Sequence, residues 1–223
     1  MNAERPLLVA LLTLTFVTGI VDAVSFLGLG HVFTANMTGN VVLLGFAVAG
    51  ASGLSVARSS LSLLAFLGGA VLGGRLRLTM ITTTRRRWIL TAGTLEAILL
   101  LAAAVVSMGL DTVGEIPSRR VYAVIVLTAA AMGLRTATVR QLAVLDMTTT
   151  VLTQTLAALA AESSVAGGAN PRVGRRVGAV LLMFAGAAAG MLLLRHGLAL
   201  PLVVSGVCVF AASAYAGVAA DAQ

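Results

Sequence analysis

Long uninterrupted apolar runs dominate the pattern of hydrophobic and polar positions. Residues 7–29, 88–110 and 198–218 form three such runs, each more than 20 residues long, without the three- to four-residue stripes of a surface helix. A helix of about 20 residues crosses the roughly 30 Å hydrocarbon core of a bilayer. The pattern therefore predicts an all-α, polytopic bundle of transmembrane helices.

Two shorter apolar runs, 38–51 and 153–166, each begin beside a polar patch. As helices they would extend roughly 21 Å at about 1.5 Å per residue, which is short for a bilayer. Segments with weak helix signals, 28–31 and 146–150, precede them. We therefore expect six full spans and two re-entrant half-helices.

Similar residues recur in the same order in the two halves of the chain, at nearly constant spacing. The matches join Gly19 with Gly133, Thr38 with Thr153, and Gly69 and Gly73 with Gly186 and Gly190. They predict a single transmembrane domain made of two repeats, 1–112 and 113–223, each with three spans and one half-helix. Three crossings invert the second repeat, an arrangement typical of many transporters and some channels. The glycines also indicate close helix packing and offer a possible contact face in a homo-oligomer.

Composition agrees with a membrane protein. Of 223 residues, 59% are apolar and 10% are charged, whereas a soluble domain carries roughly 25% charged residues. The net charge of +7 is the balance of fifteen arginines against eight acidic residues, and no aromatic residues interleave with the arginines, so we expect no nucleic-acid partner.

The arginines predict an orientation. If both short runs are re-entrant and the N-terminus is cytoplasmic, ten loop arginines lie inside and four outside, as the positive-inside rule favours. If all eight runs crossed, the count would be seven against seven. We therefore expect a multi-pass protein of the bacterial cytoplasmic (inner) membrane, in contact with the lipid bilayer. The first run is interpreted as a retained span, and a cleaved signal peptide is the alternative.

Three charged residues lie inside apolar runs, where each costs about 2.5–3.5 kcal/mol on insertion scales. The repeat places Arg135 beside Asp22, which suggests an ion pair that a solute or proton opens. Alternatively, Asp22 only locks helices together and Arg135 reaches the headgroups from a helix end. Glu96 is either a second proton carrier or the partner of a threonine or an arginine.

Polar residues around the half-helix starts form a second candidate site. Thr and Asn cap helix N-termini, and such an end attracts anions. Two ends that meet in mid-membrane would bind a small anion or a polar neutral solute; alternatively, the side chains only satisfy the backbone where helices break. The expected lining residues are Asn36, Thr38, Asn40, Thr153 and Thr155.

The leading functional hypothesis is a transporter or channel for a small polar or anionic solute or ion. A membrane scaffold or sensor is the alternative, and an intramembrane enzyme is a weaker one. The sequence has no HExxH motif, no nucleophile motif and no cofactor motif, and its lone Cys208 and two distant histidines offer no ligand cluster. We therefore expect no enzymatic activity, cofactor or metal.

The chain also resembles the YoaK-like family of bacterial polytopic membrane proteins over nearly its whole length. The motifs that carry the resemblance are Gly19-x-x-Asp22-Ala23, Phe33-Thr34-Ala35-Asn36-Met37-Thr38-Gly39-Asn40, and Ala131-Met132-Gly133-Leu134 with Thr148-Thr149-Thr150 and Thr153 downstream. The resemblance implies a polytopic membrane fold and no particular activity. Where the family tends to carry Gln-Asn after Gly-Leu, this chain has Arg135-Thr136.

Overall fold

The structure is a computed structural model that describes residues 4–110, 119–142 and 152–220. Within these ranges every regular element is helical, which confirms the all-α prediction. The helices are α1 (Glu4–Ala23), which continues as a π-helix (Val24–Gly28), α2 (Met37–Val48), α3 (Val56–Thr79), α4 (Arg85–Ser107), α5 (Arg119–Leu142), α6 (Leu152–Ala161), a 3₁₀ turn (Ser164–Ala166), α7 (Val173–Leu194) and α8 (Ala199–Ala220).

Six of these helices, α1, α3, α4, α5, α7 and α8, are long and apolar enough to cross a membrane. They confirm the prediction of a multi-pass helix bundle. The two short helices α2 and α6 have 12 and 10 residues, so they end before the predicted limits at residues 51 and 166. The weak-helix segment 146–150 and the predicted repeat boundary at 112–113 lie outside the described residues.

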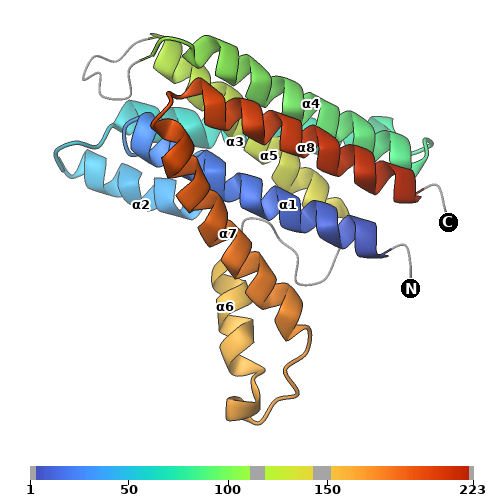
Figure 1. Ribbon diagram of the computed structural model, residues 1–223. Helices are drawn as coiled ribbons and strands as arrows, with labels where there is room; N and C mark the ends of the chain where they lie inside the picture. Colours follow the sequence, from blue (N-terminus) through green and yellow to red (C-terminus); the bar gives the residue numbers. More distant parts are fainter. Residues whose placement is uncertain (1–3, 111–118, 143–151, 221–223) are drawn as a thin grey trace.

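The helices α1, α4, α5 and α8 form the centre of the bundle. The outer helices α3 and α7 pack against α5 and α1, and the short helices α2 and α6 pack against α3 and α7. Figure 1 shows α1, α4 and α8 side by side, whereas α7 crosses them obliquely and its first half leaves the bundle together with α6.

Glycines allow the outer helices to approach the central ones. Gly133 of α5 lies against the backbone of α3 at Phe66, and Gly69 of α3 lies against the backbone of α5 at Ala130. A Cβ atom at Gly133 would overlap the Phe66 carbonyl oxygen. Contacts of the same kind join α1 and α7 through Gly19, Gly186 and Gly190. The predicted close packing is therefore confirmed, and these glycine faces are used inside the chain.

Local sequence signals explain where the helices begin. Ser55 and Thr84 cap α3 and α4 by accepting hydrogen bonds from the backbone N–H groups of Arg58 and Arg87. After α1, the chain turns through Gly30, whose φ of +86° lies in the left-handed region. Glycine adopts this conformation without strain, and the Arg58 guanidinium lies in the space that a side chain at this position would enter.

Candidate functional site

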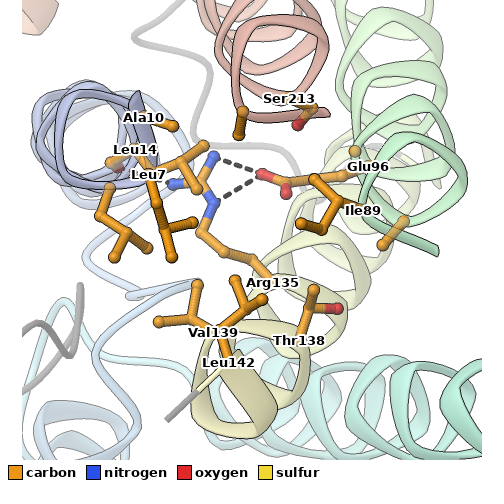
Figure 2. Close-up of a pocket in the computed structure, with 14 residues that line it drawn as sticks. Leu7, Ala10, Leu14, Ile89, Glu96, Arg135, Thr138, Val139, Leu142 and Ser213 are labelled. Atoms are coloured by element: carbon orange, nitrogen blue, oxygen red, sulfur yellow. Dashed lines mark hydrogen bonds and ion pairs between the residues drawn. The ribbon is translucent and has the colours of Figure 1, made fainter. Parts of the chain in front are cut away.

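Arg135 is the largest fully buried side chain among the described residues, with 1% of its surface exposed. Its Nε–H donates to Oε1 of Glu96 on α4 over 2.6 Å, and its Nη2 forms an ion pair with the same carboxylate (Figure 2). Its Nη1 donates to the Leu14 carbonyl oxygen at 3.0 Å and to the Thr18 Oγ1 at 2.9 Å, both on α1. One guanidinium group thus joins α1, α4 and α5.

This arrangement neutralises two charges in an apolar interior. Glu96 is 4% exposed, so neither charged group has appreciable access to water. Moving one such ion out of water costs several kcal/mol, and the cost is offset only when geometry and hydrogen bonding are good. Arg135 meets this condition through Nε and Nη1, which have hydrogen-bond partners on α4 and α1, whereas its buried Nη2 has the ion pair with Glu96 but no hydrogen bond within the described residues.

A small cavity adjoins the ion pair. Figure 2 shows Arg135 and Glu96 among its lining residues. It extends toward the end of the bundle where α1 and α4 begin and where α5 and α8 end. Its volume is about 30 Å³, which is room for about two water molecules. The lining residues are Leu7, Ala10, Leu11, Leu14, Ile89, Ala92, Gly93, Glu96, Arg135, Thr138, Val139, Leu142, Ser213 and Ala216.

The other end of the same four helices is packed. There an apolar cluster closes the bundle beyond the ion pair, and its buried side chains are no more than 1% exposed except for Leu194 at 8%. Its members include Ile20 on α1, Val24 in the π-helix that follows, Ala103 and Ala104 on α4, Val124 and Ile125 on α5, Leu198 directly before α8 and Leu202 on α8. The ion pair therefore lies between a hollow end and a closed end.

A larger basic cavity, which we call the vestibule, lies at the hollow end. Its volume is about 420 Å³, and it is lined by Arg77, Ile81, Thr83, Arg85, Trp88, Gln141 and Leu142. Leu142 also lines the cavity at Arg135. The Arg77 guanidinium lies 5.2 Å from the centre of the Trp88 ring, a cation–π contact. Of the described residues that line the vestibule, none is acidic.

The structure does not show the ion pair between Asp22 and Arg135 that the sequence suggested. Arg135 forms its ion pair with Glu96 rather than with Asp22, so the interpretation of Glu96 as the partner of an arginine is the one observed. Asp22 lies farther along α1, close enough for its charge to attract Arg135. One of its carboxylate oxygens is buried without a hydrogen-bond partner in the described part of the chain.

The predicted polar residues near the half-helix starts lie outside the Arg135 cavity. Asn36 caps α2 through a 3.1 Å hydrogen bond from the Gly39 N–H. Asn40 is buried, accepts from the Phe33 N–H at 2.9 Å, and donates to the Phe33 carbonyl and to the Ser62 Oγ. These two residues connect the preceding loop to α2 and α3.

The three predicted threonines are placed on the short helices. Thr38 on α2 and Thr153 on α6 are exposed, whereas Thr155 on α6 is buried. The structure therefore brings together Glu96 and Arg135 from the predicted set and leaves the amides and threonines elsewhere.

Sequence reasoning missed Thr18, Ser213 and the vestibule arginines Arg77 and Arg85. Thr18 could have been found as the polar residue one helical turn before Asp22, facing the interior of the same apolar run. The arginines gave no such signal, because two basic residues at the ends of neighbouring helices look like ordinary interfacial charges.

Comparison with known proteins identifies the family. The chain belongs to the family described as "Protein of unknown function (DUF1275)", which it matches over residues 10–215. It is 37% identical over 157 residues to the "UPF0700 transmembrane protein YoaK" of Bacillus subtilis (strain 168). That alignment covers 70% of this chain and 66% of the relative, and it confirms the YoaK-like resemblance. No solved structure matches the chain.

Proposed function

We propose that this member of the DUF1275 family is a transporter or channel for a small polar or anionic solute, with its path between α1, α4, α5 and α8. The observation that carries the proposal is the buried Arg135–Glu96 pair, which adjoins a cavity at one end of the bundle and faces packed apolar side chains at the other. Charged residues inside a membrane commonly mark solute or proton pathways.

We further propose that the two halves are inverted repeats. The contacts support this, because Gly133 meets Phe66 between α5 and α3 much as Gly19 meets Met183 between α1 and α7. Two of the central helices, α1 and α5, would be exchanged by the pseudo-twofold axis, and so would α4 and α8. The short helices α2 and α6 would be the re-entrant elements, and the N-terminus would lie in the cytoplasm of a bacterial cell.

The inverted arrangement suggests how a solute crosses. The hollow end holds water-sized room in this conformation, and the opposite end is closed by residues such as Val124 and Leu202. If the hollow end closes while the closed end opens, the Arg135–Glu96 pair becomes accessible from each side of the membrane in turn. Such alternating access is the common mechanism of transporters built from inverted repeats.

Uptake by proteoliposomes that contain the full chain tests this proposal. The panel consists of labelled chloride and nitrate, rubidium, alanine and urea, which represent anions, a cation, a zwitterion and a neutral solute. We expect saturable uptake of at least one solute, its loss in Arg135→Gln, and its retention in Arg195→Gln. Arg195 is an exposed arginine at the packed end, so it serves as a matched control. Absence of uptake for every solute would favour the scaffold or sensor alternative.

A further inference from the structure

Building on the proposed transport function, we propose that the solute is a small monovalent anion that moves together with a proton. In this mechanism Glu96 accepts the proton and releases Arg135, and the anion takes the place of the carboxylate opposite the guanidinium. The proposal assigns different roles to the two members of one ion pair. Arg135 binds the anion, and Glu96 carries the proton.

Arg135 is positioned to remain in place when Glu96 leaves. Its Nη1 is held from α1 by the Leu14 carbonyl and the Thr18 hydroxyl, independently of Glu96. Its Nε and Nη2 form the edge that faces Glu96. That edge is a pair of parallel N–H donors, the geometry with which arginine binds carboxylates and other oxyanions.

Glu96 is the titratable group that faces this edge. No other described residue that lines this cavity titrates. The lining residues on α1 are apolar, those on α8 are Ser213 and Ala216, and those on α5 besides Arg135 are Thr138, Val139 and Leu142. Within the described part of the chain, the charge of Asp22 also acts on Arg135, and Asp22 lies outside the cavity lining. Ala92 and Gly93 of α4 line the cavity beside Glu96, and Gly93 packs against the Ser213 side chain of α8.

This exchange leaves the charge of the site unchanged. In the empty state the Glu96 carboxylate balances Arg135, and in the loaded state the anion balances Arg135 while the carboxyl group is neutral. Both states therefore avoid an uncompensated charge in the apolar bundle, where such a charge is costly. Co-transport of one proton and one anion is electroneutral, so a change of pH, rather than an electric current, is its expected signal.

The vestibule favours an anion over a cation. Among the described residues that line it, Arg77 and Arg85 are charged and none is acidic, and Leu142 lines both this vestibule and the Arg135 cavity. A cleft lined by charges of one sign raises the local concentration of the opposite ion. The small volume beside Arg135, about 30 Å³, limits the solute to a few heavy atoms in this conformation.

The experiment uses proteoliposomes that contain the full chain and a pH-sensitive dye, with chloride and nitrate as probes. An inward chloride or nitrate gradient is expected to acidify the lumen, and an inward proton gradient is expected to concentrate the labelled anion. Protein-free liposomes give the background. Glu96→Gln is expected to keep exchange of labelled for unlabelled anion, and its proton influx is expected to fall to that background.

Glu162→Gln is the matched control, because Glu162 forms a 2.8 Å ion pair with Arg176 outside the cavity. It is expected to retain coupling between proton and anion. If Glu96→Gln does not fold, the luminal pH of wild-type vesicles and of Glu96→Asp vesicles decides the question. Glu96→Asp is expected to keep coupling, because it preserves a carboxyl group.

The outcomes separate this inference from the proposed function. Anion flux without a change of luminal pH, or coupling that survives in folded Glu96→Gln, would overturn the inference and leave transport intact. Flux of rubidium, alanine or urea, with no flux of chloride or nitrate, would also overturn the inference and leave the transport function intact. Absence of flux for every solute would overturn both the inference and the transport function.

Discussion

Arg135 of α5 and Glu96 of α4 form a hydrogen-bonded ion pair in the centre of the bundle, with 2.6 Å between Nε and Oε1. The two residues are 39 positions apart in sequence, and the pair lies between the hollow end and the closed end of the bundle. In an apolar interior, each of these charges is stable chiefly because the other is present.

The stability losses on removal of the two partners should therefore not be additive. Arg135→Gln or Glu96→Gln alone should lower the free energy of unfolding by about 3–5 kcal/mol, since each substitution leaves the other charged group buried without its partner. The double variant should lose less than the sum of the two single losses. Unfolding in detergent measures this double-mutant cycle, and strictly additive losses would contradict the energetic coupling of the pair.

The apolar runs predicted the helices well because a membrane-spanning helix is specified by composition over about 20 residues. The partner of Arg135 could not be predicted in the same way, because it depends on how α1, α4 and α5 rotate about their axes. The alignment of the two repeats placed Arg135 next to Asp22, and it gave no information about α4, which carries the actual partner Glu96. The glycine matches succeeded, since backbone contacts such as that of Gly133 with Phe66 require a missing side chain wherever helices cross closely.

The short helices were harder to interpret from sequence. Thr and Asn at a helix start satisfy either a ligand or the backbone, and both roles use the same residue types. The structure shows the backbone role for Asn36 and Asn40, whose partners are Gly39, Phe33 and Ser62. These partners depend on the path of the loop after α1, which hydrophobic periodicity does not encode.

Access of water-soluble reagents should differ between the two ends of α4. In a Cys208→Ser background, Ala92→Cys lines the cavity, whereas Ala103→Cys lies in the packed cluster. Both substitutions replace alanine by a slightly larger side chain on the same helix. A small methanethiosulfonate reagent should modify the cysteine at 92 and spare the one at 103. Equal protection of both would contradict a water-accessible cavity at Arg135.

Asn40 should be required for stability rather than for solute binding. Asn40→Ala removes the partner of the Phe33 N–H and one donor to the Phe33 carbonyl, which keeps its hydrogen bond from the Ser62 hydroxyl. Each buried polar group left unsatisfied costs about 1–3 kcal/mol. The variant should unfold at a lower temperature and keep the wild-type KM for the transported solute. Thr38→Ala, at an exposed position of the same helix, should change neither quantity; a raised KM in folded Asn40→Ala would instead support the sequence-based binding site.

Reporter fusions should locate the loops relative to the membrane. The proposed inverted repeats place a reporter fused after residue 56 outside the cell and one fused after residue 170 in the cytoplasm. The physical reason is that re-entrant segments return to the side from which they enter, so α2 and α6 do not change the side of the chain. Phosphatase and fluorescent-protein fusions measure both positions. A fusion at 170 that reports the outside would contradict the proposed topology.

The vestibule arginines should control how readily an anion reaches Arg135. Arg85→Gln removes one positive charge from the cavity that adjoins the Arg135 site, so it should raise the KM for chloride or nitrate and leave kcat nearly unchanged. Because the effect is electrostatic, the difference from wild type should shrink as ionic strength increases and the Debye length falls from about 30 Å at 0.01 M to about 10 Å at 0.1 M. Arg77 is a less suitable first target, since its contact with Trp88 also supports packing.

Two controls separate steering from a structural effect of Arg85→Gln. Arg85→Lys keeps the positive charge and should keep the wild-type KM, whereas Arg195→Gln removes an equal charge at the packed end and should also leave KM unchanged. Initial rates of anion uptake at several salt concentrations measure all three variants. If Arg85→Lys raises KM as much as Arg85→Gln does, the shape of the side chain matters rather than its charge. Electrostatic attraction of the anion into the vestibule would then be the wrong explanation for its entry.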